Sequence, residues 1–265
     1  MRKNKKVVLD VLYVFLKIIF IISLLYIIIY IFQIGKTKND LNLIQKIMIR
    51  KDTYEENNLN RTNNTNYENN NEYYKIKNFK EIQKINSDII AWIEIKNSKI
   101  NYPVLKSQNN DFYLKKNYNK EYDYNGSIFM DYRCNLDKLN SNLIIYGHNN
   151  GNGLMFDELL KYNNKEFYNT HREIELITNN NVETYEIISV FKSRVFNENE
   201  KNVFRYYNYI EFKDEKDFFT YINNVKLQSL YDINYEVNEE SKLITLSTCE
   251  YSNKNGRFVI VAIKK

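Results

Sequence analysis

The chain has 265 residues, 43% of them hydrophobic and 15% aromatic, which is enough apolar surface for a sizeable core and excludes a disordered polar chain. Two cysteines and six glycines exclude a disulfide-rich scaffold, a zinc finger of the CxxC type and a collagen-like repeat. Residues 1–35 carry +4 of the net charge of +5, so the rest of the chain is nearly neutral and we expect no nucleic-acid partner.

The N-terminal residues predict a membrane anchor. A basic tail at 1–10 precedes an apolar stretch, and residues 11–34 are the predicted transmembrane helix, because about 20 helical residues cross the ~30 Å hydrocarbon core. No Ala-x-Ala-like cleavage site follows, which favours a retained anchor over a cleaved signal peptide; a buried core helix is the other alternative. The basic residues precede the helix, so we expect a single-pass protein of the cell membrane with a cytoplasmic N-terminus and an extracellular domain.

The next segment, residues 35–72, is predicted to be a flexible tether. Apolar residues at helical spacing over 41–48 indicate a short amphipathic helix near the membrane surface. In residues 57–71, nine of the 15 positions are Asn and almost nothing is apolar. Such a segment cannot contribute to a packed core.

Residues 73–265 are predicted to form the folded domain. It opens with a helical stretch over 79–89, in which Phe79, Ile82, Ile85 and Ile89 would share one face. Further helical patterns cover 111–118, 155–168 and 215–230.

Between these helices lie short segments rich in Ile, Val, Tyr and Phe and bounded by Asn, Asp and Gly. The eight strand candidates are 91–95, 100–105, 126–132, 142–148, 173–178, 182–196, 242–248 and 257–265. Many short strands with few helices are typical of a closed or nearly closed β-barrel with helical insertions, rather than of a parallel βαβ sheet.

Two segments carry the candidate chemistry. Cys249 ends an apolar strand and precedes a polar loop, which would expose its thiol at a barrel rim. A small buried cysteine that only fills space is the alternative interpretation. His148 follows another apolar strand in a Gly/Asn-rich loop, where an imidazole can serve a thiol as base and a leaving amine as acid. Arg257 begins the next strand, so a hairpin can return its guanidinium to the same rim, where it would face a developing oxyanion.

The segments LSTC at 246–249 with Arg257, and YGHN at 146–149, resemble the two signature segments of the sortases, which are membrane-anchored cysteine transpeptidases of Gram-positive bacteria. The similarity extends over most of residues 76–265, and several segments resemble class B sortases in particular. Among these are MFDELLKY after the histidine loop and the helix before the last two strands.

The resemblance implies an eight-stranded sortase-type barrel with N-terminal helices and a long helix before the last two strands. It implies Cys249 as nucleophile, His148 as general acid/base and Arg257 as the cationic stabiliser. For the oxyanion we also expect the backbone N–H of Glu250, and Ser247 is a candidate pocket-lining residue. No carboxylate is assigned to the site, since Tyr251 stands where certain class B members have an acidic residue.

The remaining histidine and cysteine are expected to lie outside the catalytic set. His171 has a family counterpart that is not catalytic, and we interpret it as structural. Cys134, beside Arg133 in a loop, is not expected to take part in catalysis or to pair with Cys249. With two histidines and no HExxH motif we expect no metal and no cofactor.

The predicted function is therefore acyl transfer outside the cell. By the resemblance, a sorting signal of the NPxTx or LPxTG kind near the C-terminus of a secreted protein would be cleaved after Thr through a thioester on Cys249. A peptidoglycan amine would then accept the acyl group. The alternatives are an extracytoplasmic cysteine protease or hydrolase with water as acceptor, and a catalytically silent surface scaffold.

Overall fold

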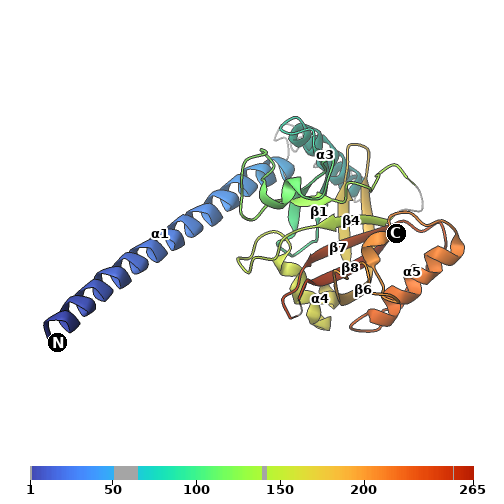
Figure 1. The fold of residues 1–265 in the computed structure, drawn as a ribbon. Coiled ribbons are helices and arrows are strands. Elements are labelled where there is room, and N and C mark those ends of the chain that lie inside the picture. The colour runs from blue at the N-terminus through green and yellow to red at the C-terminus, as the bar shows by residue number, and fades with distance from the viewer. Residues whose placement is uncertain (1, 51–64, 139–141, 253) are drawn as a thin grey trace. The chain divides into compact units, whose positions relative to one another are not determined.

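The computed structural model describes residues 2–50, 65–138, 142–252 and 254–265 (Figure 1). The chain divides into two compact units, Met1–Asp40 and Leu41–Lys265.

The first unit is the larger part of helix α1 (Arg2–Met48). Its stretch Leu9–Met48 is the one helix in the described part of the chain that is long and apolar enough to cross a membrane. None of its most apolar 18 residues is buried against protein. A core helix of a soluble protein would be buried, so the exposure argues against that alternative, while an anchor and a signal sequence both fit.

The second unit is built on a closed barrel of eight strands (Figure 1). They are β1 (Ile89–Glu94), β2 (Asn101–Leu105), β3 (Ile128–Met130), β4 (Asn142–Tyr146), β5 (Glu173–Ile177), β6 (Val182–Arg194), β7 (Leu243–Cys249) and β8 (Gly256–Lys264). Their order around the barrel is β1-β2-β3-β4-β7-β8-β6-β5, and β5 closes onto β1. The pairs β2–β3 and β4–β7 are parallel and all others antiparallel. The predicted closed barrel is confirmed.

Of the other helical elements, one precedes the strands and the rest lie between them. They are α3 (Thr65–Gln83), α4 (Lys165–Thr170), α5 (Glu215–Gln228) and the 3-10 turns η1 (Phe112–Lys115), η2 (Asp157–Asn163) and η3 (Tyr206–Asn208). The predicted helix over 155–168 is two elements, because Asn164 is extended between them and its side chain caps α4 by accepting from the Glu166 N–H at 2.8 Å. The helix expected before the last two strands is α5, whose N-cap is Asp214.

The predicted helix over 79–89 is wrong in its second half. Helix α3 ends at Gln83, Ile85 is 46% exposed, and Ile89 is the first residue of β1. The side chain of Asn86 explains the break, since it accepts from the Asp88 N–H at 2.9 Å and donates to the Tyr118 carbonyl at 2.7 Å. Local side-chain hydrogen bonds of this kind compete with the helical pattern.

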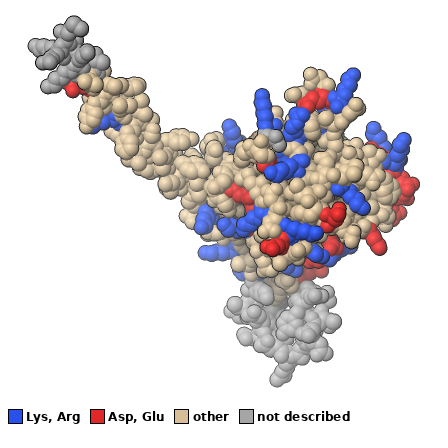
Figure 2. All heavy atoms as spheres, turned by 90° about the horizontal axis from the view of Figure 1, so that it is seen from below, with Lys and Arg blue, Asp and Glu red and all other residues tan. Residues whose placement is uncertain are grey.

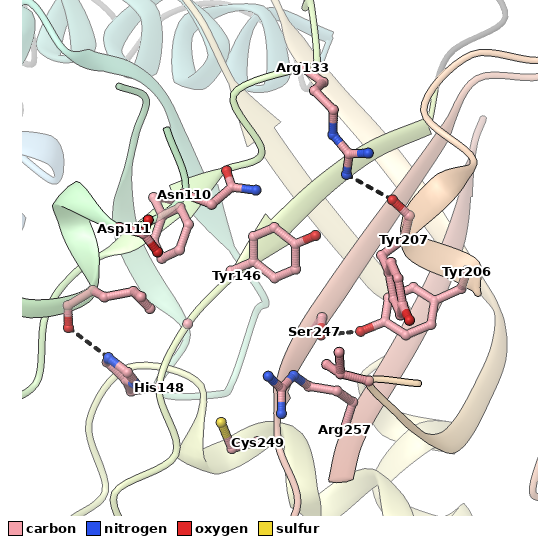
Figure 3. Close-up of a pocket in the computed structure, with 14 residues that line it drawn as sticks. Asn110, Asp111, Arg133, Tyr146, His148, Tyr206, Tyr207, Ser247, Cys249 and Arg257 are labelled. Carbon is pink, nitrogen blue, oxygen red and sulfur yellow. Dashed lines mark hydrogen bonds between the residues drawn. The ribbon is translucent and has the colours of Figure 1, made fainter. Parts of the chain in front are cut away.

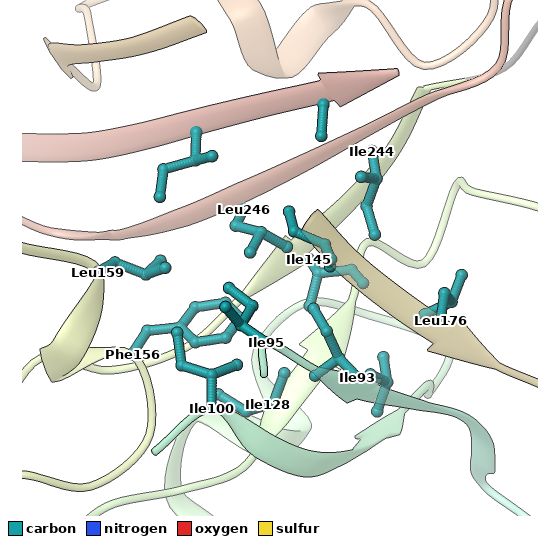
Figure 4. Packing of buried hydrophobic residues seen from close by; sticks show 14 of the residues in the cluster. Ile93, Ile95, Ile100, Ile128, Ile145, Phe156, Leu159, Leu176, Ile244 and Leu246 are labelled. Atoms are coloured by element: carbon teal, nitrogen blue, oxygen red, sulfur yellow. The ribbon is translucent and has the colours of Figure 1, made fainter. Parts of the chain in front are cut away.

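Alternation along the strands fills the barrel with aliphatic side chains (Figure 4). The interior includes Ile93 and Ile95 from β1 and its end, Ile145 from β4, and Ile244 and Leu246 from β7. A second core lies on the outer face of β6, β7 and β8, where α5 packs through one face of helical period: Phe218, Tyr221, Ile222 and Val225.

A third core joins the end of α1 and helix α3 to the barrel. Ile44 and Met48 pack with Phe79, Ile82 and Trp92. The compact unit thus begins at Leu41, upstream of the predicted start of the domain at residue 73. The division at 35–72 stays a prediction, since the central part of that tether, residues 51–64, lies outside the described residues.

On the face of the domain seen in Figure 2, basic and acidic side chains are interspersed. No extended patch of one sign covers the described part of that face, in keeping with the near-neutral charge of the chain after residue 35.

Candidate active site

The placement of Cys249 and Arg257 follows from the period of two along β7 and β8. Ile244 and Leu246 point into the barrel, so Ser247 and Cys249, which lie at odd separations from Leu246, face the opposite side of the sheet. In the antiparallel pairing Cys249 stands directly opposite Arg257, which places the thiol and the guanidinium on one rim.

The histidine reaches that rim through a different strand pair. β4 runs parallel to β7 with Tyr146 opposite Ser247, so two residues further along each chain His148 and Cys249 arrive at the same level. The Gly147 N–H donates to the Ser247 carbonyl at 3.2 Å, which continues the pairing beyond the strand. The His148 carbonyl accepts from the Phe156 N–H at 2.9 Å.

The three predicted residues line one pocket of about 320 Å³ (Figure 3). In Figure 3 the thiol, the imidazole and the guanidinium lie around the same end of it. The lining residues are Asn110, Asp111, Leu114, Phe129, Arg133, Tyr146, Gly147, His148, Val195, Tyr206, Tyr207, Ser247, Cys249 and Arg257. A thiol nucleophile, a proton carrier and a fixed cation are the groups that acyl transfer through a thioester needs.

The ring of His148 is held from the side opposite β7. Its Nε2 lies 2.7 Å from the Leu114 carbonyl oxygen. A carbonyl oxygen only accepts, so in this contact Nε2 carries a hydrogen and Nδ1 is the nitrogen left to accept a proton. Cys249 is half-buried and forms no disulfide.

The guanidinium of Arg257 is held by backbone oxygens. Its Nη1 donates to the Gly256 carbonyl at 2.9 Å, and a longer contact of 3.4 Å joins it to the Asn255 carbonyl. Within the described ranges of the chain no carboxylate lies within ion-pair distance of Arg257. None of the described residues therefore neutralises its positive charge.

Ser247 lies in the pocket wall, as expected. It is buried, and its hydroxyl is 2.7 Å from the hydroxyl of Tyr206. Burial raises the pKa of Tyr206 to about 12, so this phenol is neutral at physiological pH and can share a hydrogen with Ser247.

Glu250 is engaged away from the pocket. Its N–H, the expected oxyanion donor, donates to the Gly256 carbonyl at 3.0 Å inside the hairpin. Its carboxylate accepts from the Ser252 hydroxyl at 2.6 Å and from Lys192 at 3.1 Å. These contacts, the Ser252 hydrogen bond first, lower the pKa of Glu250.

Sequence reasoning missed Asp131, which organises the far wall of the pocket. Its side chain is fully buried and accepts from Arg133 Nε at 2.8 Å and Nη2 at 2.7 Å. It also accepts from Asn110 at 3.0 Å and from the Tyr146 hydroxyl at 3.1 Å. All three of these partners line the pocket. An acidic residue two positions before an arginine indicates at most a local ion pair, and the other two partners, Asn110 and Tyr146, come from separate segments of the chain.

The other cysteine and histidine lie elsewhere. Cys134 is 1% exposed, accepts from the Ile144 N–H at 3.3 Å and forms no disulfide. Burial raises its pKa to about 12, which keeps it a neutral thiol. His171 stacks on Phe167 beyond the C-terminal end of α4 and lines a separate polar pocket, where its Nε2 lies 3.1 Å from the Asn97 carbonyl oxygen.

A comparison with known families decides the family. A family model described as a sortase domain matches residues 93–265. The chain belongs to the sortase family. This sortase is 39% identical to sortase B of Listeria monocytogenes over 186 residues, which are 68% of this chain and 71% of the Listeria protein. It is 35% identical to sortase B of Staphylococcus aureus over 188 residues, covering 69% and 73% of the two chains.

Solved structures agree with the sequence relatives. A Staphylococcus aureus sortase B–substrate complex superposes on this sortase with a TM-score of 0.70 at 27% identity, covering 87% of this chain and 97% of that chain. Sortase B of Clostridium perfringens gives a TM-score of 0.64 at 32% identity, over 71% and 99% of the chains. The protein is a class B sortase, and its enzymatic class is that of a cysteine transpeptidase.

Proposed function

We propose that this sortase cleaves a sorting signal near the C-terminus of a secreted protein and transfers the acyl part to a peptidoglycan amine. The observation that carries the proposal is one pocket of about 320 Å³ lined by Cys249, His148 and Arg257 together. The signal is of the NPxTx or LPxTG kind and is cleaved after Thr.

The first half-reaction makes a thioester. The Cys249 thiol gives its proton to Nδ1 of His148, and its sulfur attacks the threonine carbonyl carbon, forming the C–S bond and a tetrahedral oxyanion. Arg257 stabilises the oxyanion, because its charge has no carboxylate partner in the described residues and a fixed cation favours developing negative charge. The Glu250 N–H would first have to leave the Gly256 carbonyl to add a second donor. His148 donates a proton to the amine as the C–N bond breaks.

The second half-reaction reverses the proton path. His148 takes a proton from the incoming amine, whose nitrogen attacks the thioester carbonyl, and the Cys249 sulfur leaves as the amide forms. A solved structure of sortase B complexed with triglycine supports an amine of the peptide kind as the acceptor.

The N-terminal helix is proposed to act as the anchor. With the basic tail in the cytoplasm, α1 would hold the domain at the outer surface of the cell membrane. The substrate's own membrane segment and lipid-linked cell-wall precursors would lie at the same surface, so anchoring raises their effective concentration at the pocket.

Mass spectrometry of the thioester tests this proposal. The full chain in detergent is incubated with an NPxTx and an LPxTG peptide, and we expect an adduct on Cys249 whose mass equals the acyl fragment through Thr. Adding triglycine should convert the adduct into an amide product, and the Cys249→Ala variant should give neither. Hydrolysis with no amide product at saturating triglycine would indicate a hydrolase instead. An inert wild-type protein would indicate a silent scaffold.

A further inference from the structure

A short hydrogen-bonded link joins the loop after His148 to the loop after Cys249. Asn149 is 4% exposed, and its side-chain amide donates to the Cys249 carbonyl at 3.0 Å. The hydroxyl of Tyr251 donates to the Asn149 carbonyl. The residue next to the histidine thus holds the segment that carries the thiol through both its side chain and its backbone.

The conformation of Tyr251 is unusual for an exposed aromatic residue. The residue is 72% exposed, so burial of its ring contributes little to its placement. Its hydroxyl nevertheless reaches inward to a backbone carbonyl of the opposite loop. The polar contact, rather than ring packing, fixes this side chain.

The link completes the fixation of His148. On the strand side, the Gly147 N–H is bound to the Ser247 carbonyl at 3.2 Å, and the ring of His148 is bound to the Leu114 carbonyl at 2.7 Å. On the loop side, it is Asn149 that connects the histidine segment to Cys249. We expect the loss of this connection to let the loop after His148 shift relative to the thiol.

We propose that Asn149 and Tyr251 are positioning residues that set the separation between the His148 imidazole and the Cys249 thiol. The inference rests on the roles given to His148 and Cys249 under the proposed function. Neither Asn149 nor Tyr251 lines the pocket, so both act through the groups they hold. The contribution is geometric, because proton transfer between the imidazole and the thiol requires hydrogen-bond reach.

Two substitutions each remove one of the two hydrogen bonds of this link. Asn149→Ala deletes the donor to the Cys249 carbonyl, and Tyr251→Phe deletes one hydroxyl from an exposed ring. Matched controls are Asn163→Ala, whose amide donates to the Leu160 carbonyl at 2.9 Å, and Tyr122→Phe, at a tyrosine that is 65% exposed. Neither control residue lines the pocket. All variants are made in the full chain in detergent, and thermal unfolding by circular dichroism checks their folding.

Steady-state transfer from a sorting peptide to triglycine gives the first measurement. We expect kcat to fall about tenfold for Tyr251→Phe and about 30-fold for Asn149→Ala, with KM for the peptide changed less than about twofold, since a lost hydrogen bond and a displaced catalytic group cost rate rather than affinity. The losses of the two single variants should not be additive in the double variant, because the two hydrogen bonds join the same two loops. The controls should keep wild-type kcat.

Alkylation of Cys249 by iodoacetamide at pH 7 gives a second measurement that needs no peptide. Buried Cys134 is an internal reference that should stay unlabelled. We expect slower labelling of Cys249 in both variants and an unchanged rate in the controls.

A folded Tyr251→Phe protein with wild-type kcat and alkylation rate overturns the proposal, as does a loss confined to KM or full additivity in the double variant. If Asn149→Ala does not fold, Tyr251→Phe alone decides. Failure of the proposed function would look different, since then the wild-type protein itself would form no thioester on Cys249.

Discussion

At the scale of single residues, the pocket is lined by two guanidinium groups in contrasting surroundings. Arg257 is bound by backbone carbonyl oxygens, whereas Arg133 is bound by the buried carboxylate of Asp131. The first guanidinium keeps its charge for a ligand, and the second has its charge compensated inside the wall. Substitution should therefore affect chemistry at Arg257 and stability at Asp131.

Replacing Arg257 with Lys keeps the charge and removes the forked donors. We expect kcat to fall about 100-fold, the scale of losing a transition-state donor, while the fold stays intact because the residue lies at the rim. Peptide cleavage kinetics measure the loss, with Arg172→Lys, which lies at the separate polar pocket, as the control. Wild-type turnover from the Lys variant would refute the role of Arg257.

The lowered pKa of Asp131 predicts that the stability of the fold depends on pH. Burial alone would raise its pKa, but the hydrogen bonds and the charge of Arg133, together with the hydrogen bond from Asn110, outweigh burial and hold the pKa below the usual value of 3.8. A carboxylate whose pKa is lower in the folded state than in the unfolded state stabilises the fold at pH values above the unfolded-state pKa of about 3.9. This stabilisation is lost as the pH falls through the lower folded-state pKa.

The matching variant is Asp131→Asn. We expect it to lower the free energy of unfolding at pH 7 by about 2 kcal/mol or more, since it breaks a charge-assisted network. Urea unfolding at about pH 7, 4 and 2.5 should show the difference from wild type shrinking at the acid end. A difference that stays constant with pH would mean that the carboxylate charge is not what stabilises this wall.

At the scale of elements, the site depends on three strands whose ends meet. β8 places Arg257 opposite Cys249, and β4 continues past Tyr146 to bring His148 beside them. Gly147, the residue after β4, packs closely against the barrel core. A Cβ at that residue would contact the side chains of Ile128 and, at 2.7 Å, of Phe156, both of them buried in the barrel core.

Gly147→Ala is therefore expected to displace the strand end. We predict a loss of stability of about 1–3 kcal/mol from overpacking, together with a large loss of kcat, because the displaced residue adjoins His148. Gly151→Ala is the contrast, since nothing lies within 4 Å of its added Cβ; its φ of +68° leaves only backbone strain. Thermal unfolding and peptide cleavage measure both effects, and equal behaviour of the two variants would contradict the steric argument.

The strands could be predicted well because they are apolar runs bounded by turn residues. Each predicted strand overlaps an observed one, with ends that differ by at most two residues. The predicted helix through Ile85 and Ile89 failed because a spacing of four also occurs by chance, and the hydrogen bonds of Asn86 decide the turn.

The candidate site likewise has one part that could be predicted from the sequence and one part that could not. Cys249, His148, Arg257 and Ser247 could be placed together from strand ends and motifs, and all four line one pocket. The network of Asp131 could not, because two of its three partners, Asn110 and Tyr146, come from separate segments of the chain. The hydrogen bond that occupies the Glu250 N–H depends on how the 250–256 loop closes, and nothing in residue types fixes that.

At the scale of the whole molecule, the catalytic unit includes part of the N-terminal helix. Ile44 is 1% exposed, and the preceding residue, Leu43, is 60% exposed. The amide of Gln45 donates to the Asn101 carbonyl at 2.7 Å, and Asn78 donates to the Met48 carbonyl at 2.9 Å. The helix end is thus packed and hydrogen-bonded as an element of the domain.

Neighbouring substitutions test this inclusion. We expect Ile44→Ala to lower the free energy of unfolding by about 2–4 kcal/mol through lost packing, and Leu43→Ala to change it by less than about 0.5 kcal/mol. Chemical unfolding of the full chain in detergent measures both. Equal effects would mean that residues 41–48 do not belong to the packed unit in solution.

The position of β8 has a consequence for the order of events in biogenesis. It is the last strand along the sequence, yet it lies between β7 and β6 in the barrel. Until β8 pairs, β7 has no partner on that side, and Arg257 of β8 is absent from the rim. A nascent chain without β8 would therefore carry Cys249 in an open sheet that lacks Arg257, and under the proposed function its transpeptidase activity would begin only when β8 pairs.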